Sequence, residues 1–459
     1  MKRITVLGAG PAAVVSALLL QQMNFAVQVL GRRRRDSLLE GASSRVAEGL
    51  RRAGCKYALE VMGPIWERAS SWGGEYQIAN GEHVIERSLF DSALIDDLEE
   101  AGIDFHDLTV MGIDRIDDEV RIYTRQPDNR PLTFFADYLI DARGKSTPKV
   151  AKNILAGPLS VALSRHYSGG KCGTRRTISE SFEDGWAWGT ADVDGKCSIQ
   201  FVVDPSVLEK SGELNTRHDY FYTKLQAIPR ELGDVRACSE TIARGAQAVL
   251  RGNLINPFSL RVGDAAYSND PLSGHGMYEA ISSAFAAAPV INTILNEPAQ
   301  GLLAMHYYED RAALTFAQRA KAGVSYYQNE LRWAERGFWA TRSTWDQWKP
   351  ILASKCSGGL LTVAPVVEDG LIKLRSVVIT DQHPQGVRFL GGIDLTELIS
   401  HLCEHGASDA MQTAESRLKA DSHQISAAIH WLSNLPELSA PSFDNFIARL
   451  RMVTIATAN

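Results

Sequence analysis

The feature that most constrains the fold is a glycine-containing turn between two apolar segments near the start of the chain. Residues 4–7 are apolar and partly β-branched, Gly8-Ala9-Gly10-Pro11-Ala12-Ala13 follows, residues 14–23 are largely apolar, and residues 26–30 are again strand-like. This order predicts strand, turn, helix and strand, with the Gly-x-Gly-x-x-Ala spacing of a dinucleotide-binding βαβ unit. The alternative is a plain strand–turn–helix without a ligand.

Each small residue in this turn has a physical role. Gly8 permits a tight turn, Gly10 lets the backbone approach a pyrophosphate, and Ala13 allows close packing of helix on strand. The anion would lie at the helix N-terminus, where free N–H groups and the helix dipole favour negative charge. We predict that the residues of this turn bind the cofactor: Gly8, Gly10, Pro11, Ala12 and Ala13.

The second strand departs from the usual dinucleotide-binding pattern. It normally ends in an acidic residue that binds the adenosine ribose, but Gly31 stands at that position. Arg32 or Arg33 would instead stack on adenine or contact a phosphate, and we predict both as cofactor-binding residues. The alternative is that the basic run of residues 32–35 is a solvated loop.

Composition excludes several classes of function. The 459 residues are 45% hydrophobic, enough for a large core in two or three domains, and the net charge of −6 argues against nucleic-acid binding. No apolar run is long enough to span a bilayer, and only residues 1–3 precede the first predicted strand, so we expect a cytoplasmic protein without membrane contact. The six cysteines are scattered without a CxxC pair, so we expect neither a metal site nor a disulfide framework.

The rest of the chain alternates helical and β segments. We expect a helix with Ser43 or Ser44 as its N-cap that ends near Gly54, short strands in 66–83 with turns at Gly73-Gly74 and Asn80-Gly81, a helix to residue 100, and a β-meander over 110–141. Residues 159–203 have β character, 213–233 has helical character, and helices are expected over 277–295 and 302–339. The tail from residue 345 has β-like pieces and then short helices (394–401, 410–419 and 423–435).

Five motifs stand in a fixed order: Gly8-x-Gly10-x-x-Ala13, Arg45, Arg87-x-x-Phe90-Asp91, Asp141-Ala142-Arg143-Gly144 and Gly263-Asp264-Ala265-Ala266. With them, residues 1–340 resemble the FAD-dependent monooxygenases of the p-hydroxybenzoate hydroxylase type and their relatives, the flavin-dependent halogenases. The resemblance implies an α/β fold with three parts. These are a Rossmann-like FAD-binding domain (1–158 and 240–344), an inserted β-sheet substrate domain (159–239), and a small α+β C-terminal domain (345–459) that could dock a partner.

The resemblance also implies roles for individual residues. Asp264 would bind the ribityl chain of FAD, and Arg45 would pair with the pyrophosphate. The segment from Pro271 to Met277 would pass beside the isoalloxazine ring, where a helix N-terminus would stabilise negative charge on the reduced ring; the alternative is an ordinary capped loop. The cofactor-binding set implied by these motifs is Arg45, Arg87, Ala142, Gly144, Gly263, Asp264, Pro271, Gly274, Gly276 and Met277.

Shorter motifs narrow the resemblance. Glu40-Gly41-Ala42-Ser43-Ser44-Arg45, residues 270–276 and Gly391-Gly392-Ile393-Asp394 are similar to the flavoproteins that mature cysteine tryptophylquinone enzymes in the lysine ε-oxidase, glycine oxidase and quinohemoprotein amine dehydrogenase systems. This likeness implies hydroxylation of a tryptophan side chain in a precursor protein. The partners would be that precursor, O2, and NAD(P)H or a flavin reductase.

Two other readings stay open. One is a hydroxylase or halogenase of a small aromatic, and the other is a flavin-binding escort of a precursor. Halogenases carry Trp-x-Trp-x-Ile-Pro and need a lysine between flavin and substrate; here Trp186-Ala187-Trp188 lacks the Ile-Pro, and Lys56 is the only lysine near the expected stretch. Trp186 and Trp188 either pack within a strand or line the substrate pocket, and we predict them as substrate-side residues.

The implied mechanism transfers an oxygen atom to an electron-rich indole ring. The site must exclude water, because a wet site would release hydrogen peroxide. A base would take the ring proton, and His166 and His275 are the predicted catalytic residues by type, because histidine titrates near neutral pH. The alternative for each is a structural histidine.

Overall fold

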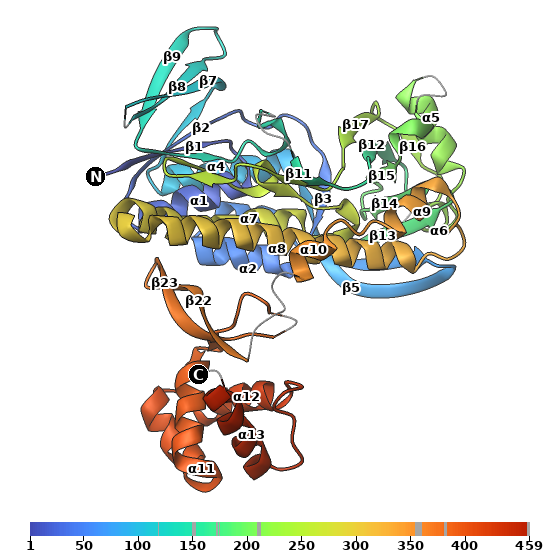
Figure 1. Cartoon of the computed structure of the whole chain (residues 1–459). Coiled ribbons are helices and arrows are strands. Elements are labelled where there is room, and N and C mark those ends of the chain that lie inside the picture. The colour runs from blue at the N-terminus through green and yellow to red at the C-terminus, as the bar shows by residue number, and fades with distance from the viewer. Residues whose placement is uncertain are drawn as a thin grey trace.

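The computed structural model describes residues 1–117, 119–148, 153–170, 173, 175–208, 213–353, 360–380 and 383–456. Two sheets lie side by side, long helices run along them, and the C-terminal region lies apart from both (Figure 1). Among the described residues, no helix combines the length and the apolar character needed to cross a membrane. The mixed α/β fold predicted from the sequence is confirmed.

The first sheet is built around the predicted βαβ unit. Its strand order is β19–β20–β10–β1–β2–β6, and every neighbouring pair except β19–β20 is parallel. The bounds are β1 Arg3–Leu7, β2 Ala26–Gly31, β6 Asp104–Asp107, β10 Tyr138–Asp141, β19 Ile255–Asn256 and β20 Ser259–Arg261. The chain moves outward through β2 and β6 and returns beside β1 through β10. The sheet therefore has a switch point between β1 and β10, where α/β proteins bind ligands.

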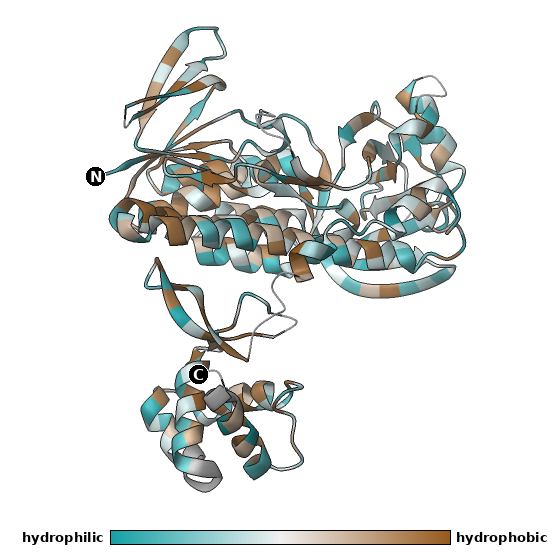
Figure 2. Ribbon diagram, in the orientation of Figure 1, coloured by the Kyte–Doolittle hydropathy of each residue, from teal (hydrophilic) through white to brown (hydrophobic). Residues whose placement is uncertain are grey.

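Helices cover this sheet because its parallel strands are apolar on both faces, as the brown ribbon around β1 and β2 shows in Figure 2. Helix α1 (Pro11–Gln22) packs against α7 (Gly276–Asn296) in the largest hydrophobic core. Around them lie α2 (Ser44–Ala53), α3 (Tyr57–Val61) and α4 (Arg87–Glu100). Helix α2 confirms its prediction: Ser43 is its N-cap and Gly54 its left-handed C-cap. A β-meander of β7 (Thr109–Ile116), β8 (Glu119–Arg125) and β9 (Pro131–Ala136) connects β6 to β10.

The second sheet has nine strands in the order β16–β12–β15–β14–β13–β4–β5–β3, with β17 also paired to β12. The bounds are β3 Leu39–Ala42, β4 Ile65–Trp72, β5 Glu75–Glu86, β12 Val161–Ser168, β13 Arg176–Phe182, β14 Gly185–Ala191, β15 Cys197–Val203, β16 Arg236–Ala237 and β17 Ile242–Gly245. Three of its strands thus come from residues 39–86, outside the range 159–239 expected for the substrate domain. The domain boundaries stay a prediction. Helices α5 (Leu214–Tyr222) and α6 (Ala227–Leu232) cover one face of this sheet.

Two long predicted segments are interrupted in the structure. The helix expected over 302–339 is α8 (Gly301–Gln328) followed by a turn and α9 (Gly337–Ser343), and residues 213–233 form two helices rather than one. Helix α8 begins against the first sheet and ends at a cluster of aromatic residues on the second. The remaining elements of the main body are the short β11 (Asn153–Ala156), β18 (Val249–Arg251), β21 (Tyr267–Ser268) and α10 (Lys349–Ala353).

The C-terminal region has its own hydrophobic core. It contains the hairpin β22 (Leu361–Glu368) and β23 (Leu371–Val378), the short pair β24 (Phe389–Leu390) and β25 (Ile393–Asp394), and the helices α11 (Leu395–Leu418), α12 (Ser422–Ser433) and α13 (Phe443–Ala456). Helix α11 is continuous where two short helices were expected, because a single glycine in a helix interior costs only about 1 kcal/mol. The hairpin attaches to the main body: Ile372 is buried and donates its N–H to Thr293 Oγ1 of α7 at 2.8 Å.

Candidate functional site

Strand β1 leads directly into the predicted glycine turn. Gly8 has a φ of +122°, and a Cβ there would lie 2.4 Å from the Ala142 carbonyl oxygen. Gly31 at the end of β2 is equally crowded, since its Cβ would lie 2.8 Å from the Gly8 carbonyl carbon. Backbone therefore fills the position where an acidic side chain was expected. Gly10 is different: it is the N-cap of α1, and only Arg87 Nη2, at 3.9 Å, comes near its Cβ position.

A network of two arginines and two carboxylates lies beside this turn. Arg87 Nη1 donates to both Glu40 carboxylate oxygens at 2.8 Å, and Arg87 Nη2 donates to Asp91 at 3.0 Å. Arg34 Nε donates to the other Asp91 oxygen at 2.6 Å. The neighbouring carboxylates raise the pKa of the Arg87 guanidinium against the opposing effect of burial. The network fixes the Arg87 guanidinium beside Gly10, with its charge balanced by the two carboxylates.

The loops after β10 and β20 meet at the same place. Ala142 contacts Gly8, and the Cβ position of Gly144 lies 3.9 Å from Asp264 Cβ. Gly263 has a φ of +58° and donates its N–H to Ser283 Oγ at 2.8 Å, which fixes the turn that carries Asp264. Among the described residues the Asp264 carboxylate accepts no hydrogen bond, and burial raises the pKa of this carboxyl.

The segment from Asp270 to Met277 leads into α7 and is anchored to α8. Asp270 accepts the Leu272 N–H at 2.9 Å, and the buried Tyr327 hydroxyl donates to Asp270 Oδ1 at 2.9 Å. Gly274 is left-handed, with a φ of +64°, and neither its Cβ position nor that of Gly276 has a neighbour within 4 Å. The predicted Pro271 starts a short 3-10 helix, and Met277 is buried in the first turn of α7.

These residues fit the predicted FAD. The open positions at Gly10, Gly274 and Gly276 leave room along α1 and α7 for a flat, extended ligand, and the free Asp264 carboxylate can accept hydrogen bonds from the hydroxyl groups of a ribityl chain. The N-terminus of α1 is where the pyrophosphate of FAD would bind, because helix N-termini favour anions. The structure thus brings the predicted turn residues together with Arg87, Ala142, Gly144, Gly263 and Asp264. We call this group of residues the FAD cradle.

Of three further predicted arginines, Arg45 lies beside the start of α7, near Tyr278 and His275, whereas Arg32 and Arg33 have other partners among the described residues. Arg45 lies on the first turn of α2, exposed, with its guanidinium 5.8 Å from the Tyr278 ring centroid. Arg32 donates to Thr109 Oγ1 at 2.9 Å, and Arg33 pairs with Glu99 at 3.3 Å. Their roles in binding pyrophosphate or adenine stay predictions.

The second sheet has one apolar and one mixed face. The register places Trp188 opposite Gln200 on β15 and Ser179 on β13, so these side chains share the face that α5 and α6 do not cover. Trp186 lies one pair further along, buried in a cluster with Tyr327 and Trp339, and Trp188 and Leu272 pack against that cluster. Because Leu272 belongs to the segment before α7, the two predicted tryptophans lie on the side of the sheet that faces the FAD cradle.

The same face carries an acidic residue that the sequence analysis missed. Glu82 of β5 accepts the Thr177 hydroxyl at 2.5 Å and the Trp188 indole N–H at 3.2 Å, both on Oε1. Its Oε2 lies 2.4 Å from the position that a Cβ of Gly41 would take. Glu82 therefore stands between β3, next to the FAD cradle, and the substrate-side strands.

The two predicted catalytic histidines lie on separate elements. His166 of β12 pairs with Ser198, which places it on the same face as Trp188, and its backbone N–H donates to Ser239 Oγ at 2.9 Å. His275 caps α7, with Nδ1 against the Ser273 carbonyl oxygen. Burial, Arg319 and Arg45 lower the pKa of His275, which keeps its imidazole neutral at neutral pH. A catalytic role for either histidine stays a prediction.

No protein-family model matches the chain. Among solved structures, it is similar to a peptidyl tryptophan dihydroxylase, QhpG, which is essential for tryptophylquinone cofactor biogenesis. The identity is 32%, the TM-score is 0.76, and the match covers 94% of this chain and 98% of that one. The chain belongs to the family of QhpG.

Other similarities to this QhpG-family protein are more distant. The flavin-dependent halogenase CmlS has a TM-score of 0.71 at 18% identity and covers 94% of each chain, which shows the shared fold. A tryptophan 2-halogenase from Chondromyces crocatus is 21% identical over 373 residues, 74% of this chain and 70% of that protein. The QhpG-family chain is a flavin-dependent monooxygenase with FAD as its cofactor, as the sequence predicted.

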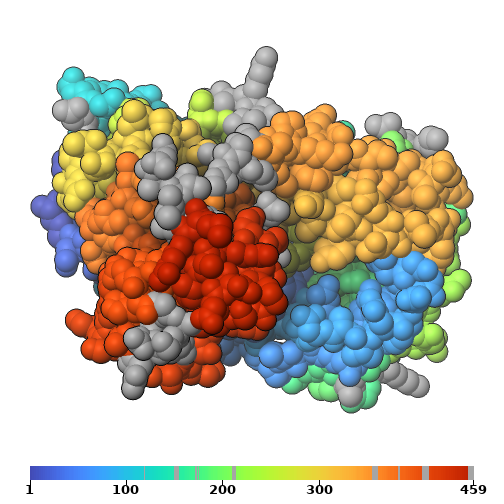
Figure 3. Space-filling model, turned by 60° about the horizontal axis from the view of Figure 1, so that its bottom comes forward, coloured from blue at the N-terminus to red at the C-terminus, as the bar shows by residue number. Residues whose placement is uncertain are grey.

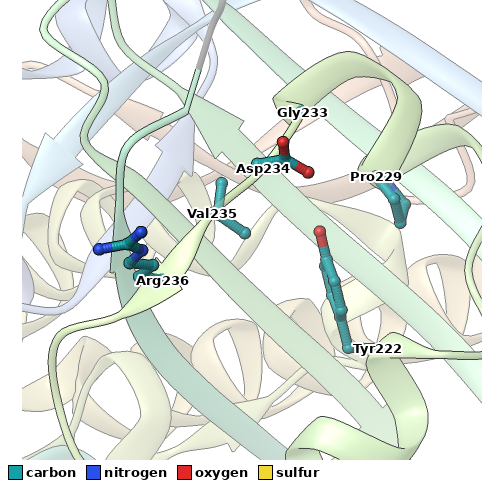
Figure 4. Close-up of a pocket in the computed structure, with 6 residues that line it drawn as sticks. All are labelled: Tyr222, Pro229, Gly233, Asp234, Val235 and Arg236. Carbon is teal, nitrogen blue, oxygen red and sulfur yellow. The ribbon is translucent and has the colours of Figure 1, made fainter.

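A cavity of about 410 Å³ lies elsewhere on the QhpG-family chain, between the end of α5, α6 and β16 (Figure 4). Its lining residues are Tyr222, Pro229, Gly233, Asp234, Val235 and Arg236. None of them is a predicted site residue. The cavity lies on the α5–α6 side of the second sheet, whereas Glu82 and Trp188 point to the other side.

Proposed function

We propose that this QhpG-family monooxygenase hydroxylates a tryptophan side chain in a precursor protein during the biogenesis of cysteine tryptophylquinone. The observation that carries the proposal is the match to QhpG, a peptidyl tryptophan dihydroxylase, at 32% identity across 94% of the chain. At 94% coverage, that match must include much of the C-terminal region, which lies beyond the residues that form the FAD cradle.

Different residues of the site would bind the cofactor, position the target indole and exclude water. When bound, reduced FAD supplies the electron pair that activates dioxygen, and NAD(P)H or a flavin reductase would replenish it. Asp264 and the glycine turn hold the cofactor, Arg87 adds positive charge beside the pyrophosphate, and Trp186 and Trp188 line the side where the target indole enters. The buried aromatic cluster around Tyr327 would exclude water from that side.

Two surface features support a macromolecular substrate. Strand β3 pairs only with residues 83–86 of β5, so the preceding part of β5 is a sheet edge with Tyr76 and Ile78 exposed. Such edges accept extended peptide segments. In Figure 3 the light-blue β5 region and the red C-terminal helices lie on the same face of the molecule, with a hollow between them. We propose that the C-terminal region helps to dock the precursor there, in the cytoplasm.

The halogenase alternative lacks its lysine at the expected position. Lys56 lies at the start of α3, its side chain is 71% exposed, and its Nζ is 3.4 Å from Glu100 Oε1. It belongs to the α3–α4 side of the FAD-binding domain and not to the substrate sheet. This placement favours oxygen transfer over halide transfer.

Intact-mass spectrometry of a tryptophylquinone precursor tests the proposal. The precursor is incubated with the protein, FAD, a reductant, dioxygen and a mixture of chloride and bromide. We expect a gain of one or two oxygen atoms on a single tryptophan and no halogen. A halogenated product would establish the alternative, and unchanged precursor with peroxide released would point to a small aromatic substrate.

A further inference from the structure

We propose that Glu82 is the carboxylate that faces the target ring and accepts the proton lost on hydroxylation. The proposal rests on the proposed function, and it assigns the acid–base step to a residue that no sequence motif indicated. Three observations carry it: how Glu82 is held, which of its oxygens is available, and where it lies between the two halves of the site.

Glu82 is held in one orientation from the substrate sheet. Thr177 on β13 and Trp188 on β14 both donate to Oε1, at 2.5 Å and 3.2 Å. Thr177 is completely buried and Glu82 is half-buried, so the carboxylate is fixed by neighbours that cannot move away easily. A catalytic group needs this kind of fixation, because a misplaced acid or base loses much of its effect.

The second oxygen of Glu82 is available. Among the described residues, Oε2 accepts no hydrogen bond, and it lies 2.4 Å from the position that a Cβ of Gly41 would take, too close for both to be present. Gly41 therefore has to be glycine for Glu82 to take this position. A carboxylate with one oxygen anchored and the other unbound can accept a proton without losing its anchor.

Glu82 also lies where cofactor and substrate must meet. On one side, Gly41 follows Glu40, whose carboxylate binds Arg87, and Arg87 lies over Gly10 of the dinucleotide turn. On the other side, Trp188 packs against the aromatic cluster together with Leu272, which precedes α7. A ring placed between the FAD cradle and Trp188 would contact Glu82.

The step balances with the reactants of the proposed function. A C–O bond forms at an aromatic carbon, with one oxygen atom of dioxygen, and the other oxygen atom leaves as water after the reduced flavin has given up an electron pair. The C–H bond then breaks, its electron pair returns to the ring, and the proton passes to Glu82 Oε2 and onward to solvent. Before that, the negative carboxylate stabilises the positive charge that develops on the indole ring.

The test compares Glu82→Gln, Glu82→Asp and the wild type with the same precursor, FAD, reductant and dioxygen. Glutamine can still accept the Thr177 and Trp188 hydrogen bonds, so the fold and the FAD content should be unchanged, but it cannot take a proton. We expect Glu82→Gln to lower the rate of oxygen insertion by about 100-fold while the reductant is still consumed and hydrogen peroxide is released. The precursor Kd should stay within about twofold, and Glu82→Asp should recover part of the activity.

Glu60→Gln, an exposed position on α3, is the matched control and should behave as wild type. Full oxygen insertion by Glu82→Gln would overturn the assignment of Glu82 and leave the proposed function intact. A loss explained wholly by weaker precursor binding would also overturn it. If the wild type inserts no oxygen into the precursor, both proposals fail, so the two kinds of failure are distinguishable.

Discussion

Single residues in the cofactor cradle carry unbalanced charge, and Asp264 is the clearest case. Burial raises the pKa of its carboxyl, so the folded apoprotein binds this proton more tightly than the unfolded chain does. Stability from this group is therefore present at low pH and is lost as the pH rises through the raised pKa. A ligand that donates hydrogen bonds to the ionised carboxylate would offset this loss.

Asp264→Asn should separate the cost of the Asp264 charge to the stability of the apoprotein from its contribution to FAD binding. Without the buried charge, the apoprotein should be more stable at neutral pH and its stability should depend less on pH. The FAD affinity should fall by about tenfold, because hydrogen bonds to a charged acceptor are worth about 1.5–3 kcal/mol. Urea unfolding of the apoprotein and fluorescence titration with FAD measure the two quantities. A stabilised variant with unchanged FAD affinity would contradict the role of Asp264 as a ligand.

Arg87 holds the charge network together, so its removal should be costly. Its side chain is 11% exposed, and Arg87→Met would leave the buried Asp91 carboxylate, which is 5% exposed, with less positive charge around it. We expect a loss of about 3 kcal/mol in the free energy of unfolding. Arg51→Ala, which removes an exposed pair with Glu48, should cost less than about 1 kcal/mol. If urea unfolding gives a similar loss in the free energy of unfolding for both variants, the charge network around Arg87 contributes little to stability.

At the scale of elements, α8 ties the segment before α7 to the substrate sheet. The Tyr327 hydroxyl donates one hydrogen bond that the two Asp270 carboxylate oxygens share, at 2.9 and 3.1 Å. Tyr327→Phe should lower stability by about 1–2 kcal/mol. If the segment before α7 lies beside the flavin, as we propose, the variant should also raise the fraction of reductant that ends as peroxide, because that segment is less fixed. Tyr326→Phe, an exposed neighbour, should change neither. Thermal unfolding measures the change in stability, and a peroxide assay measures the fraction of reductant lost. An unchanged peroxide fraction in Tyr327→Phe would show that the Tyr327–Asp270 hydrogen bond does not hold this segment for catalysis.

The elements that the sequence predicted well are those set by local chemistry. The glycine turn, the cap residues of α2 and the turn at Gly73-Gly74 all appear where glycine or a capping residue demanded them. Asn80-Gly81 was predicted as a turn and is instead part of the long strand β5. Gly81 is needed there because a Cβ would collide with Ile65 and the Trp66 carbonyl oxygen, at the irregularity in the β4–β5 pairing. Because this contact is with residues on another strand, the sequence around Gly81 does not indicate it.

The same distinction applies to the site. The residues of the FAD cradle stand in motifs and were predicted together, whereas Glu82 lies in a strand without any motif and meets Thr177 and Trp188 only through pairing between strands. The turn that ends α8 also depends on distant contacts. Buried Glu330 accepts the Gly73 N–H at 2.8 Å and the Ser181 hydroxyl at 2.6 Å, and it pairs with Arg332. No glycine or proline marks that turn in the sequence.

For the whole molecule, the C-terminal region is a second body with its own core, attached through the β22–β23 hairpin. On one face of the hairpin, between the buried Ile372 and Val378, Val363 is 63% exposed and Leu374 is 50% exposed. If this region docks the precursor, Val363→Lys with Leu374→Lys should weaken precursor binding at least about tenfold and leave FAD binding intact. Val193→Lys, in the exposed turn between β14 and β15, is the control. Unchanged precursor affinity in calorimetry would remove the hairpin from the docking surface.

The central claim is that the chain inserts oxygen from dioxygen into one tryptophan of a precursor protein. The most direct measurement is tandem mass spectrometry of a tryptophylquinone precursor after reaction under heavy-isotope dioxygen, with FAD and a reductant. We expect heavy oxygen on a single tryptophan, in proportion to the reductant consumed. Unlabelled oxygen in the product, or a precursor that is unchanged while peroxide accumulates, would contradict it.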